Sequence, residues 1–137
     1  PDAKDPTWAQ LVDFLKRDDT DQIPYDYNSF VCADFAHRLH DNAEKAGWRC
    51  YYVGVKLGPS PDRSSSEGHA LNAFKTTDRG LVYIDCTGPT EREEPRSGDT
   101  TVKVVVGQEY LPKHIFPSNG WNYLPMGKVL EIDLFED

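Results

Sequence analysis

The stretch FVCADFAHRLHDNAEKAG, residues 30–47, has the clearest helical pattern in the chain. Its apolar side chains recur three or four positions apart, as the buried face of a helix requires. These positions are Phe35, Leu39, Ala43 and Ala46. Asn28 or Ser29 can cap the start of the helix, and Gly47 can end it in a left-handed conformation. The sequence therefore predicts a helix from Phe30 to Ala46.

Cys32 falls in the first turn of this predicted helix. A thiol is a useful nucleophile at neutral pH only when its pKa is lowered, and a helix N-terminus and a nearby imidazolium both stabilise the thiolate. Taken alone, a cysteine at this position is more often a small buried apolar residue. A catalytic interpretation of Cys32 therefore depends on whether the chain also supplies its partners.

Two strand-like runs farther along the chain supply candidate partners. GHALNAF, residues 68–74, and LVYID, residues 81–85, are joined by KTTDRG, whose end suits a tight hairpin. If this hairpin centres on Thr77, His69 lies directly opposite Asp85 on the same face, with Cβ atoms ~5 Å apart. A one-residue slip would place Cys86 there and send Asp85 to the other face.

These residues suggest a Cys-His-Asp nucleophilic site. Cys32 would attack an acyl carbon, His69 would take the thiol proton and later protonate the leaving group, and Asp85 would orient the imidazole. The amide N–H of Cys32, at the helix start, could donate a hydrogen bond to the oxyanion. A second donor is expected just upstream, from the candidates Tyr25, Tyr27 and Asn28.

The whole chain is predicted to form an α+β domain with an antiparallel sheet, because the predicted helices come first and the predicted strands follow. A capping box at Thr7 opens a predicted helix over residues 7–17. Further strands are predicted over residues 48–57, 101–106 and 129–134. The length of 137 residues fits one domain, with a core over residues 28–87 and C-terminal strands and loops over 88–137.

Charge and composition exclude several function classes. The net charge of −8 and the lack of a Lys/Arg cluster argue against nucleic acid and anionic membranes as partners. No apolar run approaches the ~20 residues of a transmembrane helix, and no signal peptide is recognised. Three cysteines do not make a disulfide scaffold; Cys50 and Cys86 are expected to pair or, more in keeping with free cysteines, to be buried thiols.

The segments around Cys32, His69 and Asp85 together resemble the core of the transglutaminase-like superfamily, in its compact bacterial and archaeal form. The resemblance rests on FVCADFA at residues 30–36, GHALN at 68–72 and VYIDCT at 82–87, in that order. It implies a papain-like fold in which the nucleophile helix packs on an antiparallel sheet. It also implies cofactor-free acyl transfer on a protein or peptide substrate, by peptide or isopeptide hydrolysis, deamidation or transamidation.

One position departs from the papain-like pattern. Those enzymes carry a Gln six residues before the Cys as an oxyanion donor, whereas this chain has Asp26, which when ionised can only accept hydrogen bonds and cannot donate one. Either a neighbouring Tyr or Asn replaces that donor, or activity is weak or lost. The alternative to an enzyme is thus a catalytically inactive binding or structural module with the same fold.

Two further expectations complete this interpretation. Cys32, His69 and Asp85 could instead bind zinc, but catalytic zinc sites mostly use His-rich or Cys-paired ligands, so no metal is expected. The chain begins at Pro1 rather than Met. We therefore interpret it as a processed form or as a piece of a longer protein. Separately, we expect that protein to be exported or at the cell surface.

Overall fold

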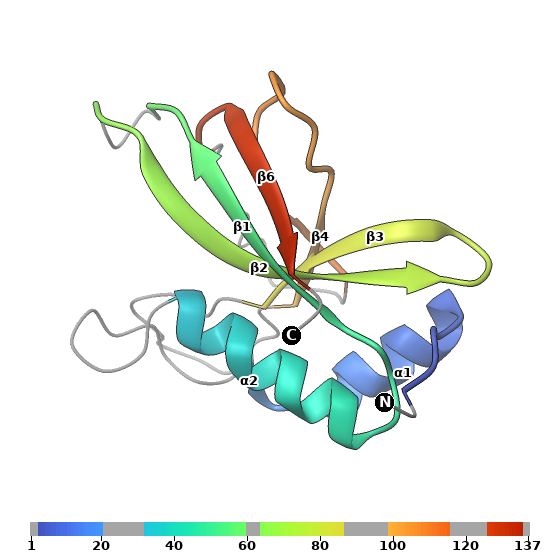
Figure 1. Ribbon diagram of the computed structural model, residues 1–137. Helices are drawn as coiled ribbons and strands as arrows, with labels where there is room; N and C mark the ends of the chain where they lie inside the picture. Colours follow the sequence, from blue (N-terminus) through green and yellow to red (C-terminus); the bar gives the residue numbers. More distant parts are fainter. Residues whose placement is uncertain (1–2, 21–31, 60–63, 87–98, 116–125, 136–137) are drawn as a thin grey trace.

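The computed structural model describes residues 3–20, 32–59, 64–86, 99–115 and 126–135. Among these residues, two helices come first and six strands follow. Figure 1 shows how they are arranged. The helices are α1 (Trp8–Arg17) and α2 (Cys32–Lys45). The strands are β1 (Tyr51–Leu57), β2 (Glu67–Thr76), β3 (Gly80–Asp85), β4 (Thr100–Val102), β5 (Lys113–His114) and β6 (Val129–Phe135).

The strands form one antiparallel sheet in the order β5-β4-β3-β2-β1-β6, with β6 at one edge. Both helices lie on the same face of this sheet, and α2 runs beneath β1 and β2 (Figure 1). The predicted α+β class and the antiparallel sheet are therefore confirmed. No helix in the described part of the chain is long and apolar enough to cross a membrane.

Helix α1 begins as its sequence predicts. The side chain of Thr7 accepts a hydrogen bond from the Gln10 backbone, and the Gln10 side chain accepts one from the Thr7 backbone, which completes the capping box. Leu11 and Leu15 are buried against the sheet side of the molecule. The helical residues end at Arg17, as expected.

Helix α2 keeps most of its predicted packing face. Phe35, Leu39 and Ala43 are buried, and Gly47 has the expected left-handed conformation, with φ of 93°. The prediction was wrong for Ala46, which is exposed because the helix ends at Lys45, one residue earlier. The predicted caps, Asn28 and Ser29, and the residues 30–31 lie outside the described part of the chain.

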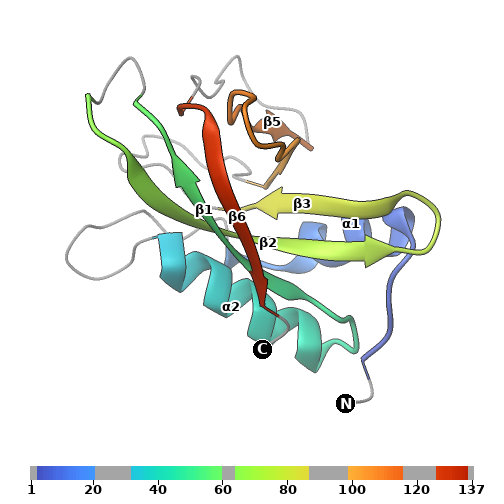
Figure 2. The same cartoon turned by 45° about the horizontal axis from the view of Figure 1, so that its top comes forward.

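Each face of the sheet has its own buried cluster. The cluster between the helices and the sheet comprises Leu11, Leu15, Phe35, Leu39, Ala43, Cys50, Phe74, Ile84 and Cys86. The cluster on the opposite face comprises Tyr51, Val53, Val55, Leu57, Leu71, Ala73, Val102, Val104, Tyr110 and Val129. Figure 2 shows β5 and the segment that follows β4 lying over this second face. Residues 69–74 of β2 are therefore buried on both sides of the sheet.

The predicted register of the β2–β3 hairpin was wrong by two residues. The strands pair as Thr76↔Gly80 and Asn72↔Ile84, so the hairpin centres on Asp78 rather than Thr77. Continued by one step, this register sets Asp85 level with Leu71, and His69 becomes its diagonal neighbour. Because side chains alternate with a period of two, a two-residue shift keeps Asp85 on the same face as His69.

Two strands are clearly shorter than the sequence predicts. Strand β1 begins at Tyr51 instead of residue 48, because Trp48 forms a bridge with Lys4. Strand β4 ends at Val102 instead of residue 106, because its pairing with β3 ends at Tyr83↔Val102. The strand expected over residues 129–134 is confirmed as β6.

Candidate active site

The first residues of β2 are not paired with β3, so α2 can approach β2 there. Pairing between β2 and β3 begins at Asn72↔Ile84, so the earlier part of β2 lies beyond that ladder. Cys32, the first residue of α2, reaches this part of β2, where the backbone N–H of Ala70 donates to the Cys32 sulfur. The helix start and the strand edge thus hold the thiol from two sides.

The structure brings Cys32, His69 and Asp85 together. The His69 ring is hydrogen-bonded both to the Cys32 thiol and to Asp85, with 2.7 Å between His69 Nε2 and Asp85 Oδ2. A carboxylate only accepts hydrogen bonds, so Nε2 carries the proton in this pair. The nitrogen left to face Cys32 is therefore Nδ1, which accepts a proton in the neutral imidazole.

The three side chains differ in how far they are exposed to solvent. The side chains of His69 and Asp85 are each only 6% exposed, whereas Cys32 is partly exposed. An ion pair this buried is little screened by solvent or salt. The nucleophile can thus be reached from outside while the pair behind it is shielded.

The pKa of the Cys32 thiol is lowered despite its partial burial. Burial is the largest single influence and raises the pKa, because it disfavours the charged thiolate. The hydrogen bond and charge of His69, together with the hydrogen bond from Ala70, outweigh burial and leave the pKa below its ordinary value of 9.0. The site therefore favours a thiolate.

The pKa of His69 moves in the opposite direction. Burial lowers it, but the charge and hydrogen bond of Asp85 and the contact with Cys32 raise it further, to about 10. The two shifts act together, because each favours the charged form of its group and so favours an imidazolium beside a thiolate more than isolated side chains would.

Tyr110 is a part of the site that the sequence did not reveal. Its hydroxyl donates a hydrogen bond of 2.6 Å to Asp85 Oδ2, and its ring meets the His69 ring edge-on, with centroids 5.3 Å apart. Tyr110 is fully buried. In the sequence it is one aromatic in an irregular stretch, and no spacing links it to Asp85.

The main chain around Asp85 is held as well. Thr100 Oγ1 donates a hydrogen bond of 2.7 Å to the Asp85 carbonyl, and Asp85 pairs with Thr100 between β3 and β4. Strand β4 therefore fixes the backbone from which the carboxylate projects.

The oxyanion donors are only partly defined. Cys32 begins α2, and the first N–H groups of a helix have no partner within the helix. Its amide therefore remains a candidate donor. The other candidates, Tyr25, Tyr27 and Asn28, lie outside the described residues, as does Asp26.

A cavity of about 360 Å³ opens onto Cys32. Its lining includes His69 and the small residues Gly54, Gly68 and Ala70 from β1 and β2. Glu131 and Asp133 line it from β6, the strand at the edge of the sheet. The thiol can thus be reached across the β1–β6 side of the sheet.

The two remaining cysteines are buried free thiols, as the sequence favoured, rather than a disulfide. Burial raises the pKa of the Cys50 thiol well above its ordinary value, although Asn72 donates a hydrogen bond to it. Cys50 is therefore a poor nucleophile. Within the described ranges, no group of three or more His, Cys, Asp or Glu side chains is arranged to hold a metal ion.

No protein-family model matches the chain, and no significant match occurs among curated proteins or solved structures.

Proposed function

We propose that the chain is a cysteine-nucleophile acyl-transfer enzyme in which Cys32, His69 and Asp85 form a catalytic triad. The observation that carries this proposal is the chain of hydrogen bonds from a partly exposed thiol to a buried imidazole and on to a buried carboxylate. This order matches the roles of nucleophile, general base and orienting group. The open cavity at Cys32 provides room for a substrate.

In the proposed reaction, the Cys32 thiolate attacks the acyl carbon of an amide, and a C–S bond forms as the carbonyl electrons move to oxygen. The C–N bond then breaks, and the imidazolium of His69 gives its Nδ1 proton to the departing amine. Water or a second amine next attacks the thioester and passes a proton to His69. Release of the Cys32 thiolate and regeneration of the imidazolium complete hydrolysis or transamidation.

We extend the proposal to the fold. A nucleophile at the start of a helix that packs on an antiparallel sheet, with the His and Asp on that sheet, is the arrangement expected of a papain- or transglutaminase-like core. Support comes from the contacts of α2 with β1 and β2, and from the positions of His69 on β2 and Asp85 on β3.

The proposal is tested by the pH dependence of Cys32 alkylation with iodoacetamide, followed by mass spectrometry. Because the pKa of Cys32 is lowered, its labelling should already be fast at pH values where an ordinary thiol of pKa 9.0 is largely protonated. In His69→Ala, burial still raises the pKa while the contributions of His69 are lost. Labelling at neutral pH should then fall, because the pKa of Cys32 rises and each unit of rise lowers the thiolate fraction tenfold.

Cys50 and Cys86 serve as internal controls, because both are buried free thiols in the same molecule.

Asp85→Asn should also slow turnover of model amides and esters steeply, because an amide can favour the wrong imidazole tautomer. If Cys32 labels no faster than a free cysteine and His69→Ala has no effect, the triad is not catalytic. The chain would then be better described as a binding or structural module of this fold.

A further inference from the structure

A straight row of residues crosses the sheet from its edge to the thiol. Asp133 on β6 lies opposite Gly54 on β1, Gly54 lies opposite Ala70 on β2, and the Ala70 N–H donates to the Cys32 sulfur. Neighbouring strands are ~4.8 Å apart, so Asp133 is on the order of 10 Å from Ala70. All four residues line the same cavity.

The middle of this row is empty of side chains. A Cβ atom placed on Gly54 would meet nothing within 4 Å, so the floor between Asp133 and Ala70 is open space. Gly68 lies on the same face of β2, two residues from Ala70, and also lines the cavity. The floor next to Cys32 is therefore built from the smallest residues.

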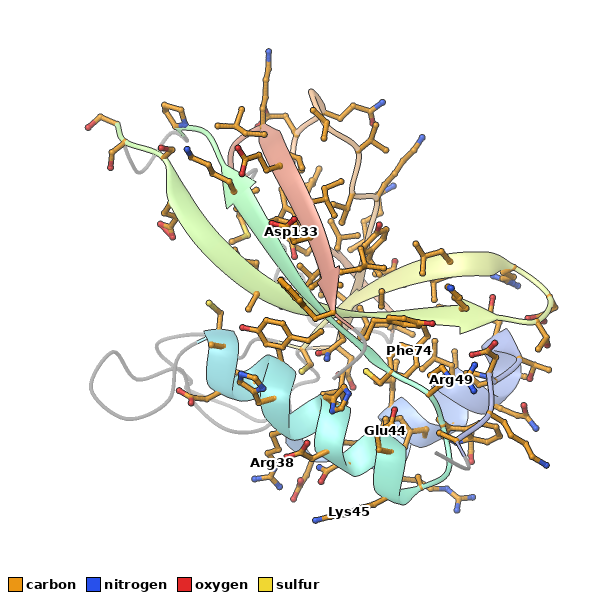
Figure 3. The ribbon with its side chains drawn as sticks, viewed as in Figure 1. Arg38, Glu44, Lys45, Arg49, Phe74 and Asp133 are labelled. Carbon is orange, nitrogen blue, oxygen red and sulfur yellow. The ribbon has the colours of Figure 1, made fainter. Side chains whose placement is uncertain are left out.

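The two carboxylates on β6, Glu131 and Asp133, lie opposite different residues of β1. Glu131 lies directly opposite Lys56, and opposite charges at facing positions attract. Asp133 lies opposite Gly54, which has no side chain. Neither Glu131 nor Asp133 has an ion pair among the described residues, so the two carboxylates differ in the residue that faces them. Asp133 is exposed, and Figure 3 labels it on β6. It is the carboxylate in the cavity that lacks a facing cation.

We propose that Asp133 is a specificity-determining residue that selects acyl substrates carrying a positive charge about two strand spacings from the acyl carbon. A lysine or arginine side chain next to the scissile bond has this reach. The substrate would lie across Gly54 with its cation at Asp133 and its acyl carbon at Cys32. This inference rests on the proposed function, because it requires Cys32 to be the nucleophile.

The test compares three iodoacetamides whose N-substituents have equal length and end in an ammonium, a methyl or a carboxylate group. The length is chosen to match the span from Cys32 to Asp133. The ammonium probe should label Cys32 roughly two- to five-fold faster than the methyl probe, as expected for an exposed ion pair. The carboxylate probe should be the slowest, and added salt should compress these differences.

Asp133→Asn should remove the preference for the ammonium probe, and Asp133→Lys should reverse it. Glu131→Gln is the matched control, because it removes a neighbouring carboxylate that already faces Lys56, and it should leave most of the preference. Equal rates for the ammonium and methyl probes, or a preference that survives Asp133→Asn, would overturn the assignment to Asp133.

Plain iodoacetamide separates this inference from the proposed function. If it labels Cys32 rapidly and His69→Ala slows it, the nucleophile is established whatever the charged probes show. A missing charge preference would then contradict the role of Asp133 alone. If Cys32 is not activated toward plain iodoacetamide, the proposed function and the inference fail together.

Discussion

At the scale of single residues, the site depends on one carboxylate oxygen. Asp85 Oδ2 accepts hydrogen bonds from both His69 Nε2 and the Tyr110 hydroxyl, at 2.7 and 2.6 Å. Two donors from different directions fix the rotation of the carboxylate and favour its ionised form. The orientation of the His69 ring is thus set in part by a residue that never reaches the thiol.

Tyr110→Phe tests this positioning role, because it removes only the hydroxyl. We expect a loss of about 1.5–3 kcal/mol in the free energy of unfolding, typical of a hydrogen bond to a charged group. We also expect slower Cys32 alkylation and an altered pH profile, since the His69–Asp85 pair is less constrained. Both are measured by urea unfolding and iodoacetamide labelling over a pH series.

Tyr83→Phe is the control. It removes the hydroxyl of another tyrosine, on β3, whose side chain is only partly buried. A pH profile of Tyr110→Phe identical to that of the unmodified chain would reduce Tyr110 to a stabilising residue.

At the scale of elements, the sequence predicted the parts of the site that local patterns encode. The helix with Cys32 at its start, the strand with His69 and the strand ending at Asp85 all follow from periodicity and turn residues. The face shared by His69 and Asp85 was also predicted, although the hairpin centre was not. The alternation of side chains shows which residues share a face, whereas the geometry of the turn decides the pairing register. A turn containing Thr77, Asp78 and Arg79 is compatible with more than one register.

What the sequence could not predict depends on contacts between distant segments. Tyr110 reaches Asp85 only because the segment after β4 folds over the second face of the sheet. The row from Asp133 to Cys32 exists only because β6 pairs with β1. Neither pairing leaves a periodic signal in one sequence.

Gly54 gives a prediction at this scale. Replacement by Val should be tolerated, because a Cβ there has open space and Val suits a strand better than Gly does. The added side chain would stand on the cavity floor beside Cys32. We expect stability to be unchanged or higher, by up to ~1 kcal/mol, while labelling by long iodoacetamides slows more than labelling by iodoacetamide itself.

Gly54→Ala is the graded control, and thermal unfolding reports stability in parallel. If Gly54→Val slowed long and short reagents equally, the floor at Gly54 would not be the route to the thiol.

At the scale of the whole molecule, the second face of the sheet supports the site from behind. The backbone of Tyr110 is held on both sides by the segment before β6, through Tyr110 N–H to the Gly127 carbonyl and Met126 N–H to the Tyr110 carbonyl. This segment in turn packs on the end of β1, where Gly58 N–H donates to the Lys128 carbonyl. The backbone of Tyr110 is therefore held by residues 126–127, and the neighbouring Lys128 is held in turn by the end of β1.

Gly127→Ala should disturb that support. Gly127 has φ of 109°, and a Cβ there would clash with the Gly58 carbonyl oxygen, so the backbone must shift. We expect a loss of more than ~1 kcal/mol in stability. The pKa of Cys32 should also move toward its ordinary value, as measured by thiolate absorbance against a Cys32→Ser reference.

Gly107→Ala is the matched control: it also has a positive φ, of 92°, but its added Cβ would meet nothing within 4 Å. If the two variants were equally destabilised, strain in the backbone conformation rather than the close approach to Gly58 would be responsible.

The thiol, imidazole, carboxylate and phenol come from α2, β2, β3 and the segment after β4, so no short piece of the chain contains them all. An unfolded or half-synthesised chain holds three ordinary cysteines, each with the low reactivity of a largely protonated thiol. Completion of the tertiary structure is then itself the activation step. Under the proposed chemistry, a chain in which these four segments have not yet come together carries no activated thiol.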